Sequence, residues 1–459
     1  MCRQNLYLLA IALLSFSCEK NDDDTLPYAE TELMPGGEGT ISSSGPDAYT
    51  FPLSNLSGDN IARHFEADAA FEQSFVTFPS TQAAGVGPLF NQNSCASCHI
   101  RNGRSQPPSS FTDASSGLLM RLSMPGAGAH GEPLPVDGFG GQLQTKSIFG
   151  VSPEGKLELN YIEQIVAFLD GTQVSLRNPQ YQIVQTYQPM PAGALTSPRN
   201  APPVFGLGLL EAIPESDILA LADEHDSDGD GISGKANYAW DIASQQMKLG
   251  RFGWKAANPT LAQQTADAFH QDMGVTSAFY FPLEHCEGQS NCSTGIGNEP
   301  DITREFAELT AFYSQSLGVP APRNFNKAEV QAGRRLFLDI GCASCHVPKY
   351  TTGAHATSEL AAQTIYPYTD MLLHDMGEGL ADHRPDFLAN GLEWRTPPLW
   401  GIGLTQIVNS KATFLHDGRA RTLTEAILWH GGEGEEAKEK FRKLSQTERE
   451  QVLRFLESL

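Results

Sequence analysis

The chain has 459 residues, with 31 Lys and Arg against 54 Asp and Glu, a net charge of −23 and 40% hydrophobic residues. This length allows two or three domains with sizeable cores, and the hydrophobic fraction excludes wholesale disorder. The excess of acidic residues repels phosphate backbones, so we expect no nucleic-acid partner.

The first 17 residues (1–17) are expected to be a signal peptide. Arg3 supplies a positive charge, and residues 6–14 form an apolar run that is too short to span a bilayer. The segment leads into Cys18 and resembles a lipoprotein signal, in which this cysteine is acylated after cleavage; an ordinary secretory signal is the alternative. No later run reaches the roughly 18 apolar residues of a membrane helix. The sequence therefore predicts an exported outer-membrane lipoprotein that faces the periplasm or the cell surface and contacts the membrane by its lipid anchor only.

Residues 18–59 are acidic and rich in Gly, Ser and Pro, and they are expected to form a flexible acidic tether. The folded body is expected to begin near residue 60, where residues 61–75 show the helical spacing of apolar side chains. Residues 328–338 and 445–459 show the same spacing. Since few stretches alternate with period two, the sequence predicts a mainly α protein.

A predicted helix precedes each of two copies of the motif Cys-Ala-Ser-Cys-His. Cys-x-x-Cys-His is the signature of covalent haem attachment, because two thiols at this spacing reach the two vinyl groups and the adjacent histidine reaches the iron. A zinc site is disfavoured because no further Cys-x-x-Cys pair completes one. The sequence therefore predicts two covalently bound c-type haems. The residues expected to hold them are Cys95, Cys98 and His99 for the first haem, and Cys342, Cys345 and His346 for the second.

An internal repeat follows the two motifs. Residues 201–209 (APPVFGLGL) match residues 396–404 (TPPLWGIGL), and further on in each copy a phenylalanine stands eight residues before a Thr-Leu pair. The simplest explanation is a duplication. The sequence thus predicts two cytochrome c-like haem domains related by internal duplication, with loop-rich insertions. The N-terminal domain is expected over residues 60–322 and the C-terminal domain over residues 323–459.

An acidic loop in the expected N-terminal domain has the spacing of a calcium-binding loop. Alternate carboxylates along Asp-Ser-Asp-Gly-Asp-Gly can converge on one hard cation, and the second glycine permits a sharp turn. Asparagine replaces the bidentate glutamate at the last ligand position, so a weaker site is expected, and an acidic surface turn is the alternative. The expected Ca²⁺ ligands are Asp226, Asp228, Asp230, the carbonyl of Ile232, and Asn237.

Cys286 and Cys292 are the cysteines that remain once the two motifs, Cys2 and Cys18 are set aside. They stand close together in a polar loop. In an oxidising compartment they are expected to pair as a small disulfide, which leaves no cysteine over.

Several further segments resemble the di-haem oxidoreductase family, some members of which are labelled thiol oxidoreductases. The likeness covers residues 60–459 and includes GLGLLEAIP, DSDGDGISGKAN, LGRFGWKA and EWRTPPLWGIGL. That family is similar to bacterial di-haem cytochrome c peroxidases and MauG-type enzymes. The resemblance implies an oxidoreductase, and hydrogen peroxide is its expected oxidant.

The resemblance also implies a second axial ligand for the second haem. His430 stands where the related peroxidases carry a methionine ligand, so His346 and His430 are expected to share this iron. A histidine that caps a helix C-terminus is the alternative. His/His ligation lowers the potential of a haem relative to Met/His ligation, which is a departure from the standard peroxidases.

The first haem is expected to be the reactive one. A peroxidatic haem needs an open face, a base that moves a proton between the peroxide oxygens, and polar groups that stabilise the departing oxygen. Trp254 falls near the position of an inter-haem tryptophan and is expected on the electron path, a buried core tryptophan being the alternative. Asn200 and Thr396 match positions at which related peroxidases bind calcium between the haems. The candidate distal-pocket residues are Gln264, His270, Asp272 and Glu211, and for each the alternative is a polar residue on an exposed helix or at a helix cap.

These features together predict an exported enzyme that passes electrons from the C-terminal haem to a reactive N-terminal haem, where hydrogen peroxide is reduced. An electron-donor protein or a quinol-linked cytochrome is the expected partner. Two alternatives stay open. One is MauG- or rubber-oxygenase-like oxidation of a protein or organic substrate, and the other is a di-haem electron carrier without turnover. An open face at the first haem would separate the enzyme from the carrier.

Overall fold

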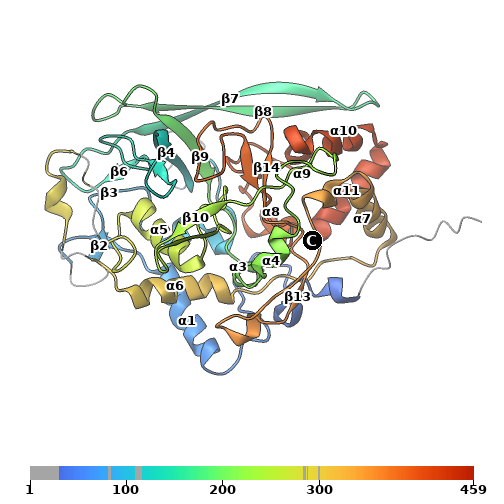
Figure 1. The fold of residues 1–459 in the computed structure, drawn as a ribbon, viewed down its shortest axis with the longest axis horizontal. Helices are drawn as coiled ribbons and strands as arrows, with labels where there is room; N and C mark the ends of the chain where they lie inside the picture. Colours follow the sequence, from blue (N-terminus) through green and yellow to red (C-terminus); the bar gives the residue numbers. More distant parts are fainter. Residues whose placement is uncertain (1–29, 81–83, 109–115, 283–285, 287, 298–299) are drawn as a thin grey trace, which may run out of the picture.

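The computed structural model describes residues 30–80, 84–108, 116–282, 286, 288–297 and 300–459 (Figure 1). The expected signal peptide and Cys18 lie outside the described residues. Within the described ranges, no helix combines the length and the hydropathy that a membrane crossing requires.

Helices and strands alternate along the whole chain. The α-helices are α1 (Asp59–Glu72), α2 (Cys95–Cys98), α3 (Leu207–Glu211), α4 (Glu215–Leu219), α5 (Leu261–Met273), α6 (Arg304–Ser316), α7 (Ala328–Asp339), α8 (Thr405–Val408), α9 (Leu423–Leu428), α10 (Glu435–Lys443) and α11 (Gln446–Ser458). The 3-10 helices are η1 (Glu30–Leu33), η2 (Gly37–Gly39), η3 (Ile100–Asn102), η4 (Cys292–Gly295), η5 (Cys342–Ser344), η6 (Ser358–Leu360), η7 (Ile402–Leu404) and η8 (Gly432–Gly434). The strands are β1 (Val76–Thr77), β2 (Ala84–Val86), β3 (Leu89–Phe90), β4 (Leu118–Ala127), β5 (Pro133–Leu134), β6 (Lys146–Ser147), β7 (Lys156–Ala167), β8 (Gln173–Val184), β9 (Leu195–Asn200), β10 (Tyr238–Asp241), β11 (Gln246–Leu249), β12 (Tyr350–Thr351), β13 (Thr364–Ile365), β14 (Leu373–Asp375) and β15 (Glu393–Arg395).

The prediction of a mainly α, cytochrome c-like fold is wrong. The chain is 30% helical and 21% strand, and its strands form many small sheets. In the longest pairing, β7 and β8 form an antiparallel hairpin from Lys156↔Val184 to Ala167↔Gln173, which runs along one side of the molecule (Figure 1). Polar and apolar residues alternate at the start of β7 (156–161), at the start of β8 (173–177) and along residues 120–124 of β4. Most of the other strands have only two to four residues, which is too short for a period of two to show.

The expected tether is also wrong for residues 30–58, which pack onto the body. Glu32 is buried and pairs with Arg334 of α7 at 2.8 Å. Tyr49 stacks on Phe205 with ring centroids 4.1 Å apart, and its hydroxyl donates to the Gly401 carbonyl at 2.6 Å. A few anchoring side chains in a Gly-rich stretch are enough to order it, and composition alone hides them.

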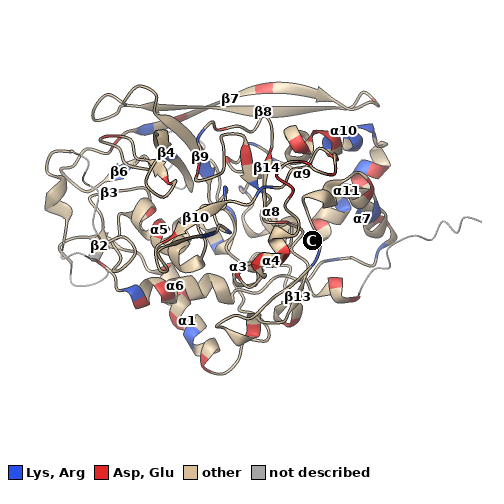
Figure 2. Cartoon of the chain, viewed as in Figure 1, with Lys and Arg blue, Asp and Glu red and all other residues tan. Residues whose placement is uncertain are grey.

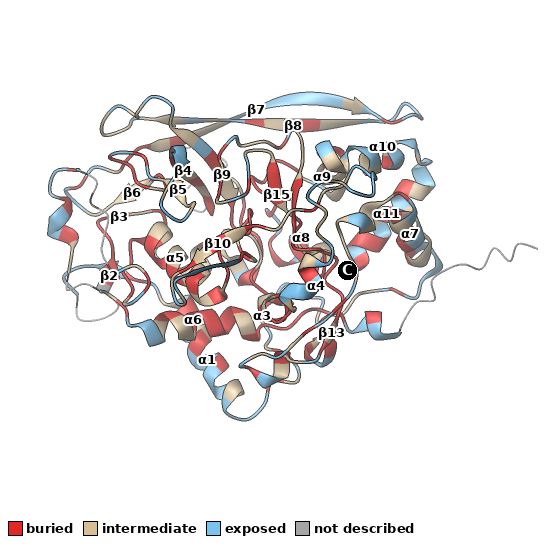
Figure 3. Ribbon diagram, in the orientation of Figure 1, coloured by how far each residue is buried: buried red, intermediate tan, exposed pale blue. Residues whose placement is uncertain are grey.

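The hydrophobic core does not divide at the expected boundary between residues 322 and 323. One core cluster joins Phe312 to Trp400, and another joins Trp254 to Phe455. Figure 3 shows buried residues running through the centre of the molecule between its two halves. The two halves therefore share their cores.

The repeated sequence segments adopt matching local structures. Gly206 and Gly401 both have left-handed backbones, with φ of 71° and 70°. A Cβ at Gly206 would lie 2.7 Å from Trp400, and one at Gly401 would lie 2.6 Å from Phe205, so the two copies pack on each other where only glycine fits. The later parts of the repeat match too, because α5 and α9 are each capped by a threonine side chain.

A helix pair closes each half, α1 with α6 and α7 with α11. We expect Gly333→Ala, in α7, to lower the free energy of unfolding by about 1–3 kcal/mol, because its Cβ would lie 1.8 Å from the Gln451 carbonyl oxygen of α11. This clash outweighs the gain of about 1 kcal/mol in helix propensity. Chemical denaturation of the holoprotein measures it. Gly45→Ala, where a Cβ meets open space, is the control and should change stability little; equal stabilities for the two variants would contradict the packing argument.

Candidate functional site

Three of the predicted ligand histidines share one geometry. In each, Nδ1 lies at hydrogen-bond distance from a backbone carbonyl oxygen. A carbonyl oxygen only accepts, so Nδ1 carries the proton and Nε2 keeps a lone pair. This is the tautomer that a metal-binding imidazole needs. The pairs are His99 with Pro202 (2.8 Å), His346 with Tyr368 (3.0 Å) and His430 with Ala426 (2.8 Å).

The same three imidazoles are neutral. Burial lowers the pKa of His99 and of His346 to about 4, and it lowers the pKa of His430 below its ordinary value. An imidazole must be neutral to donate its lone pair to iron.

The four motif cysteines are free thiols held on single turns of helix, Cys95 and Cys98 in α2 and Cys342 in η5, with Cys345 directly after it. The Ser94 side chain caps α2 by accepting from the Ser97 amide at 3.2 Å. Burial raises the pKa of Cys95 and of Cys342 to about 12.

A cavity of about 890 Å³ lies between the two C-terminal histidines. Cys342, Cys345 and His346 line it, and so does His430. This volume falls in the range of about 300–1,000 Å³ that is usual for ligand and cofactor sites. Two imidazole lone pairs, two thiols and largely apolar walls fit a haem. The apolar lining includes Phe337, Ile340, Leu380, Leu399, Phe414, Val452 and Leu456.

Residues 28–459 match the family model described as "Di-haem oxidoreductase, putative peroxidase". The chain belongs to the di-haem oxidoreductase family. A comparison with curated proteins found no match. Membership implies two haems and a general oxidoreductase activity of the peroxidase kind. The cavity between His346 and His430 fits one of these haems, and the first motif, with His99, is the candidate site of the other.

Near the first motif of this di-haem oxidoreductase, Asp272 is the distal-pocket candidate whose charge acts on the thiols. Its charge helps to raise the pKa of both Cys95 and Cys98. Burial raises the pKa of Asp272 itself to about 6. A carboxyl group with a pKa near neutrality can both give and take a proton at physiological pH.

The sequence missed the residues that surround Asp272. Gln142 donates to Asp272 Oδ1 at 2.9 Å, and Arg121 of β4 pairs with Asp267 of α5 at 3.0 Å. The positive charge of Arg121 also opposes the rise in the pKa of Asp272. Helical spacing would not have linked Asp267 to Asp272, because side chains five residues apart lie roughly 140° apart around a helix. Arg121 and Gln142 could not be found either, because β4 and the bridge that pairs Gln142 with Arg121 were not predicted.

His270 and Gln264 lie on α5 with Asp272, but they already have partners. The His270 ring is buried and stacks on Phe281, with centroids 5.1 Å apart and an interplanar angle of 12°. Gln264 Oε1 accepts from Asn258 Nδ2 at 3.1 Å.

Glu211 holds the start of α5. Its carboxylate accepts from the Leu261 amide at 2.8 Å and from Gln315 Nε2 at 2.7 Å, and His355 Nε2 lies 3.4 Å away. A carboxylate at a helix N-terminus satisfies an orphan amide and stabilises the helix dipole. This position agrees with the cap that was the alternative for this residue.

Trp254 lies between the two sites. It lines the second-haem cavity, and its indole N–H donates to the Asn200 carbonyl at 2.9 Å. The Asn200 side chain accepts from Ser105 Oγ at 2.5 Å. Ser105 and Cys98 both lie beside Gly117, because a Cβ at this glycine would lie 2.7 Å from Ser105 and 3.1 Å from Cys98. Neighbouring residues thus connect the second cavity with the first motif.

At the expected inter-haem calcium site, the side-chain oxygen of Asn200 and the carbonyl oxygen of Thr396 already accept hydrogen bonds. The Asn200 side chain both accepts from and donates to Ser105. The Thr396 carbonyl accepts from the Thr369 hydroxyl at 2.6 Å and from Arg395 at 3.0 Å. A guanidinium at this carbonyl opposes a cation in the same place.

The acidic loop brings three carboxylates together, with ligand oxygens of Asp226, Asp228 and Asp230 within 4.8 Å of one another. The prediction of Asn237 as the last ligand is wrong. Its side chain is buried and donates to the carbonyls of Lys255 (2.7 Å) and Asp386 (3.0 Å). The chain turns inward at this point to start β10, which carries Asn237 away from the loop.

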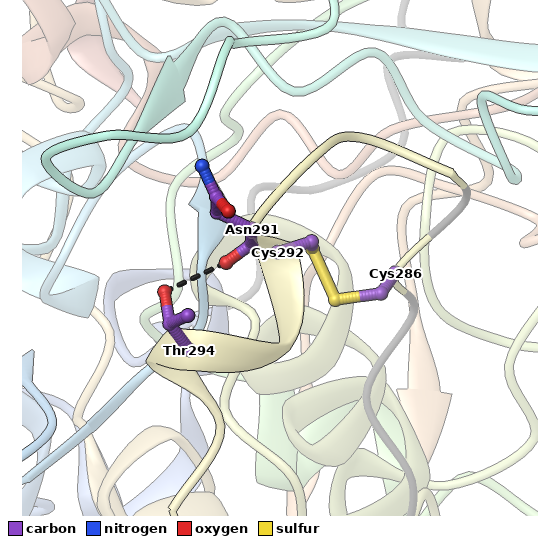
Figure 4. Close-up of a disulfide and its surroundings, with 4 residues drawn as sticks. All are labelled: Cys286, Asn291, Cys292 and Thr294. Carbon is purple, nitrogen blue, oxygen red and sulfur yellow. Dashed lines mark hydrogen bonds between the residues drawn. A yellow bond between two sulfur atoms is a disulfide. The ribbon is translucent and has the colours of Figure 1, made fainter.

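Cys286 and Cys292 form a disulfide, with Cα atoms 5.8 Å apart (Figure 4). Cys292 opens η4, and the Thr294 hydroxyl donates to the Asn291 carbonyl at 2.7 Å beside it. The bond closes a short surface loop.

Asp272 gives a pH prediction. Its folded-state pKa of about 6 exceeds the ordinary 3.8, so between these pH values the folded protein binds more protons than the unfolded chain and stability falls as pH rises. Asp272→Asn removes this loss, so we expect it to raise the free energy of unfolding by roughly 1–3 kcal/mol at pH 8 and by less at pH 4. Denaturation of the holoprotein at both pH values measures this. The control is Asp339→Asn, because Asp339 is exposed. If Asp272→Asn changed the free energy of unfolding by the same amount at both pH values, the prediction would be contradicted.

Proposed function

We propose that this chain is an exported di-haem peroxidase, in which electrons enter at the C-terminal haem and hydrogen peroxide is reduced at the N-terminal haem. The observation that carries the proposal is the difference between the two sites. In the C-terminal site two neutral histidines, His346 and His430, line one cavity. At the N-terminal motif, which carries His99, the charge of Asp272 acts on both cysteines, and Gln142 donates a hydrogen bond to this acid.

The haems, when bound through thioether bonds to Cys95, Cys98, Cys342 and Cys345, supply the one-electron iron chemistry that the reaction needs. The conversion of one hydrogen peroxide to two waters consumes two electrons and two protons. In this proposal Asp272 holds a proton at its carboxyl oxygen and delivers it, and Gln142 orients that carboxyl group. Trp254, which is buried and lines the C-terminal cavity, would lie on the electron path between the two haems.

The remaining parts of the proposal concern location and partners. Acylation of Cys18 would anchor the protein to the outer membrane, and an electron-donor protein or a quinol-linked cytochrome would supply the electrons. The loop of Asp226, Asp228 and Asp230 would bind Ca²⁺, for which carboxylate oxygens are the preferred ligands.

A low-temperature EPR spectrum of the calcium-loaded holoprotein, as isolated and half-reduced, tests the proposal. We expect one high-spin ferric signal beside one low-spin bis-histidine signal. Two low-spin signals that persist after half-reduction would contradict it and favour an electron carrier. An open first haem without peroxide reduction would instead favour oxidation of an organic or protein substrate.

A further inference from the structure

Two arginines line the C-terminal cavity from different parts of the chain. Arg104 follows the first motif, five residues after His99, and Arg395 ends β15. Arg104 is 7% exposed. The segment that carries the first haem motif thus contributes a cation, Arg104, to the C-terminal cavity.

Neither arginine forms an ion pair with a described residue. The charge of Asp370 acts on Arg395, but this carboxylate already pairs with His374 at 2.7 Å. Arg104 Nη1 donates to the carbonyls of Leu415 (3.2 Å) and Thr413 (3.5 Å). Arg395 donates to the carbonyls of Gly253 (3.1 Å) and Thr396 (3.0 Å). Burial lowers the pKa of both guanidinium groups to about 10. Burying a cation without a counter-charge is costly, so such a pair points to an anion that completes the site.

The other cations at this cavity are already neutralised. On α10, Lys438 pairs with Glu435 at 2.6 Å and Lys440 pairs with Glu436 at 2.8 Å. Figure 2 shows this helix carrying both signs of charge at the surface. Two unpaired guanidinium groups therefore remain, and each can bind one carboxylate through two parallel hydrogen bonds.

We propose that Arg104 and Arg395 bind the two propionate carboxylates of the C-terminal haem, an inference that rests on the proposed function. Thioether bonds at Cys342 and Cys345 fix the vinyl side of the group, so its carboxylates point to another part of the cavity. The Arg104 guanidinium lies 5.2 Å from the Trp254 ring centroid. The carboxylate side of the second haem therefore faces Trp254 and the N-terminal half.

Redox titration of the two-haem holoprotein tests the inference in Arg104→Met and Arg395→Met. Loss of a nearby positive charge stabilises the ferric state relative to the ferrous state, so the midpoint potential of the bis-histidine haem should shift negative in each variant and further in the double variant. The propionate bending modes in resonance Raman spectra should shift as well. Arg104→Lys and Arg395→Lys keep the charge and should keep the potential near that of the parent protein.

Arg323→Met is the matched control, because Arg323 also donates only to backbone carbonyls, those of Glu457 and Leu459, and does not line the cavity. Its potentials should equal those of the parent. Unchanged potentials in both methionine variants, beside an intact bis-histidine signal, would overturn this inference alone. A parent protein without that signal would overturn the proposed function and the inference with it.

Discussion

Replacement of His430 by alanine is expected to abolish the low-spin bis-histidine EPR signal and to replace it with a high-spin ferric signal. The Nδ1–H of His430 donates to the Ala426 carbonyl at 2.8 Å, one turn back along α9. This bond fixes the ring and leaves Nε2 as the atom that can bind iron. In the proposed function, electrons enter at this haem. We therefore also expect donor-driven peroxide reduction to fall about tenfold or more, equivalent to at least about 1.4 kcal/mol in the barrier, because the haem would lose its fixed coordination.

His416→Ala is the control for this experiment. His416 is buried and lines the same cavity, but its ring stacks on Trp394 with centroids 3.7 Å apart and an interplanar angle of 12°. Its loss should leave the low-spin signal in place. Added imidazole should restore that signal in His430→Gly, because the small ligand can occupy the space of the missing ring. If His416→Ala lost the signal and His430→Ala kept it, the iron ligand would be His416 and not His430.

The sequence predicted the parts of the site that local chemistry specifies. Covalent attachment of a haem would require the spacing of the Cys-x-x-Cys-His copies, so this motif can be recognised without a structure. Thr260 and Thr422 were found as equivalent positions of the repeat, and each caps its helix through the side chain. Such short-range features depend on neighbours in the chain, which the sequence contains.

The parts that were missed depend on contacts between distant segments. The ion pair of Glu32 with Arg334 joins residues 302 positions apart, and no local pattern distinguishes such a glutamate from one in a linker. Asn237 fell at the last position of a calcium-loop pattern, yet the structure buries it beside Lys255. Spacing defines where a side chain can reach, whereas packing decides where it goes.

The largest expected effect on stability comes from Lys255, which is 0% exposed in the interior shared by the two halves. Its ammonium donates to Asp382 at 2.7 Å and to the carbonyls of Arg384 and Asn390, each at 2.8 Å, and it lies 4.6 Å from the Trp394 ring centroid. All three of its protons therefore have acceptors. Lys255→Met leaves the buried Asp382 carboxylate without its closest cation, and we expect it to lower the free energy of unfolding by about 3–5 kcal/mol.

The same lysine predicts how stability depends on pH. Burial lowers the pKa of Lys255 to about 8, below the ordinary 10.5, and Asp382 opposes this shift. Between pH 8 and 10.5 the unfolded chain thus binds more protons than the folded protein, so this group makes stability rise with pH across that window. Lys255→Met should remove the rise, and chemical denaturation at pH 7 and pH 10 measures both effects. The control is Arg454→Met, because Arg454 and its partner Glu457 are 64% and 49% exposed, and such a surface ion pair contributes about 1 kcal/mol or less. A second change, Asp382→Asn, should recover part of the loss in Lys255→Met by removing the charge left behind. A loss no larger than that of the Arg454 variant would mean that Arg199, 3.7 Å from Asp382, neutralises this carboxylate by itself.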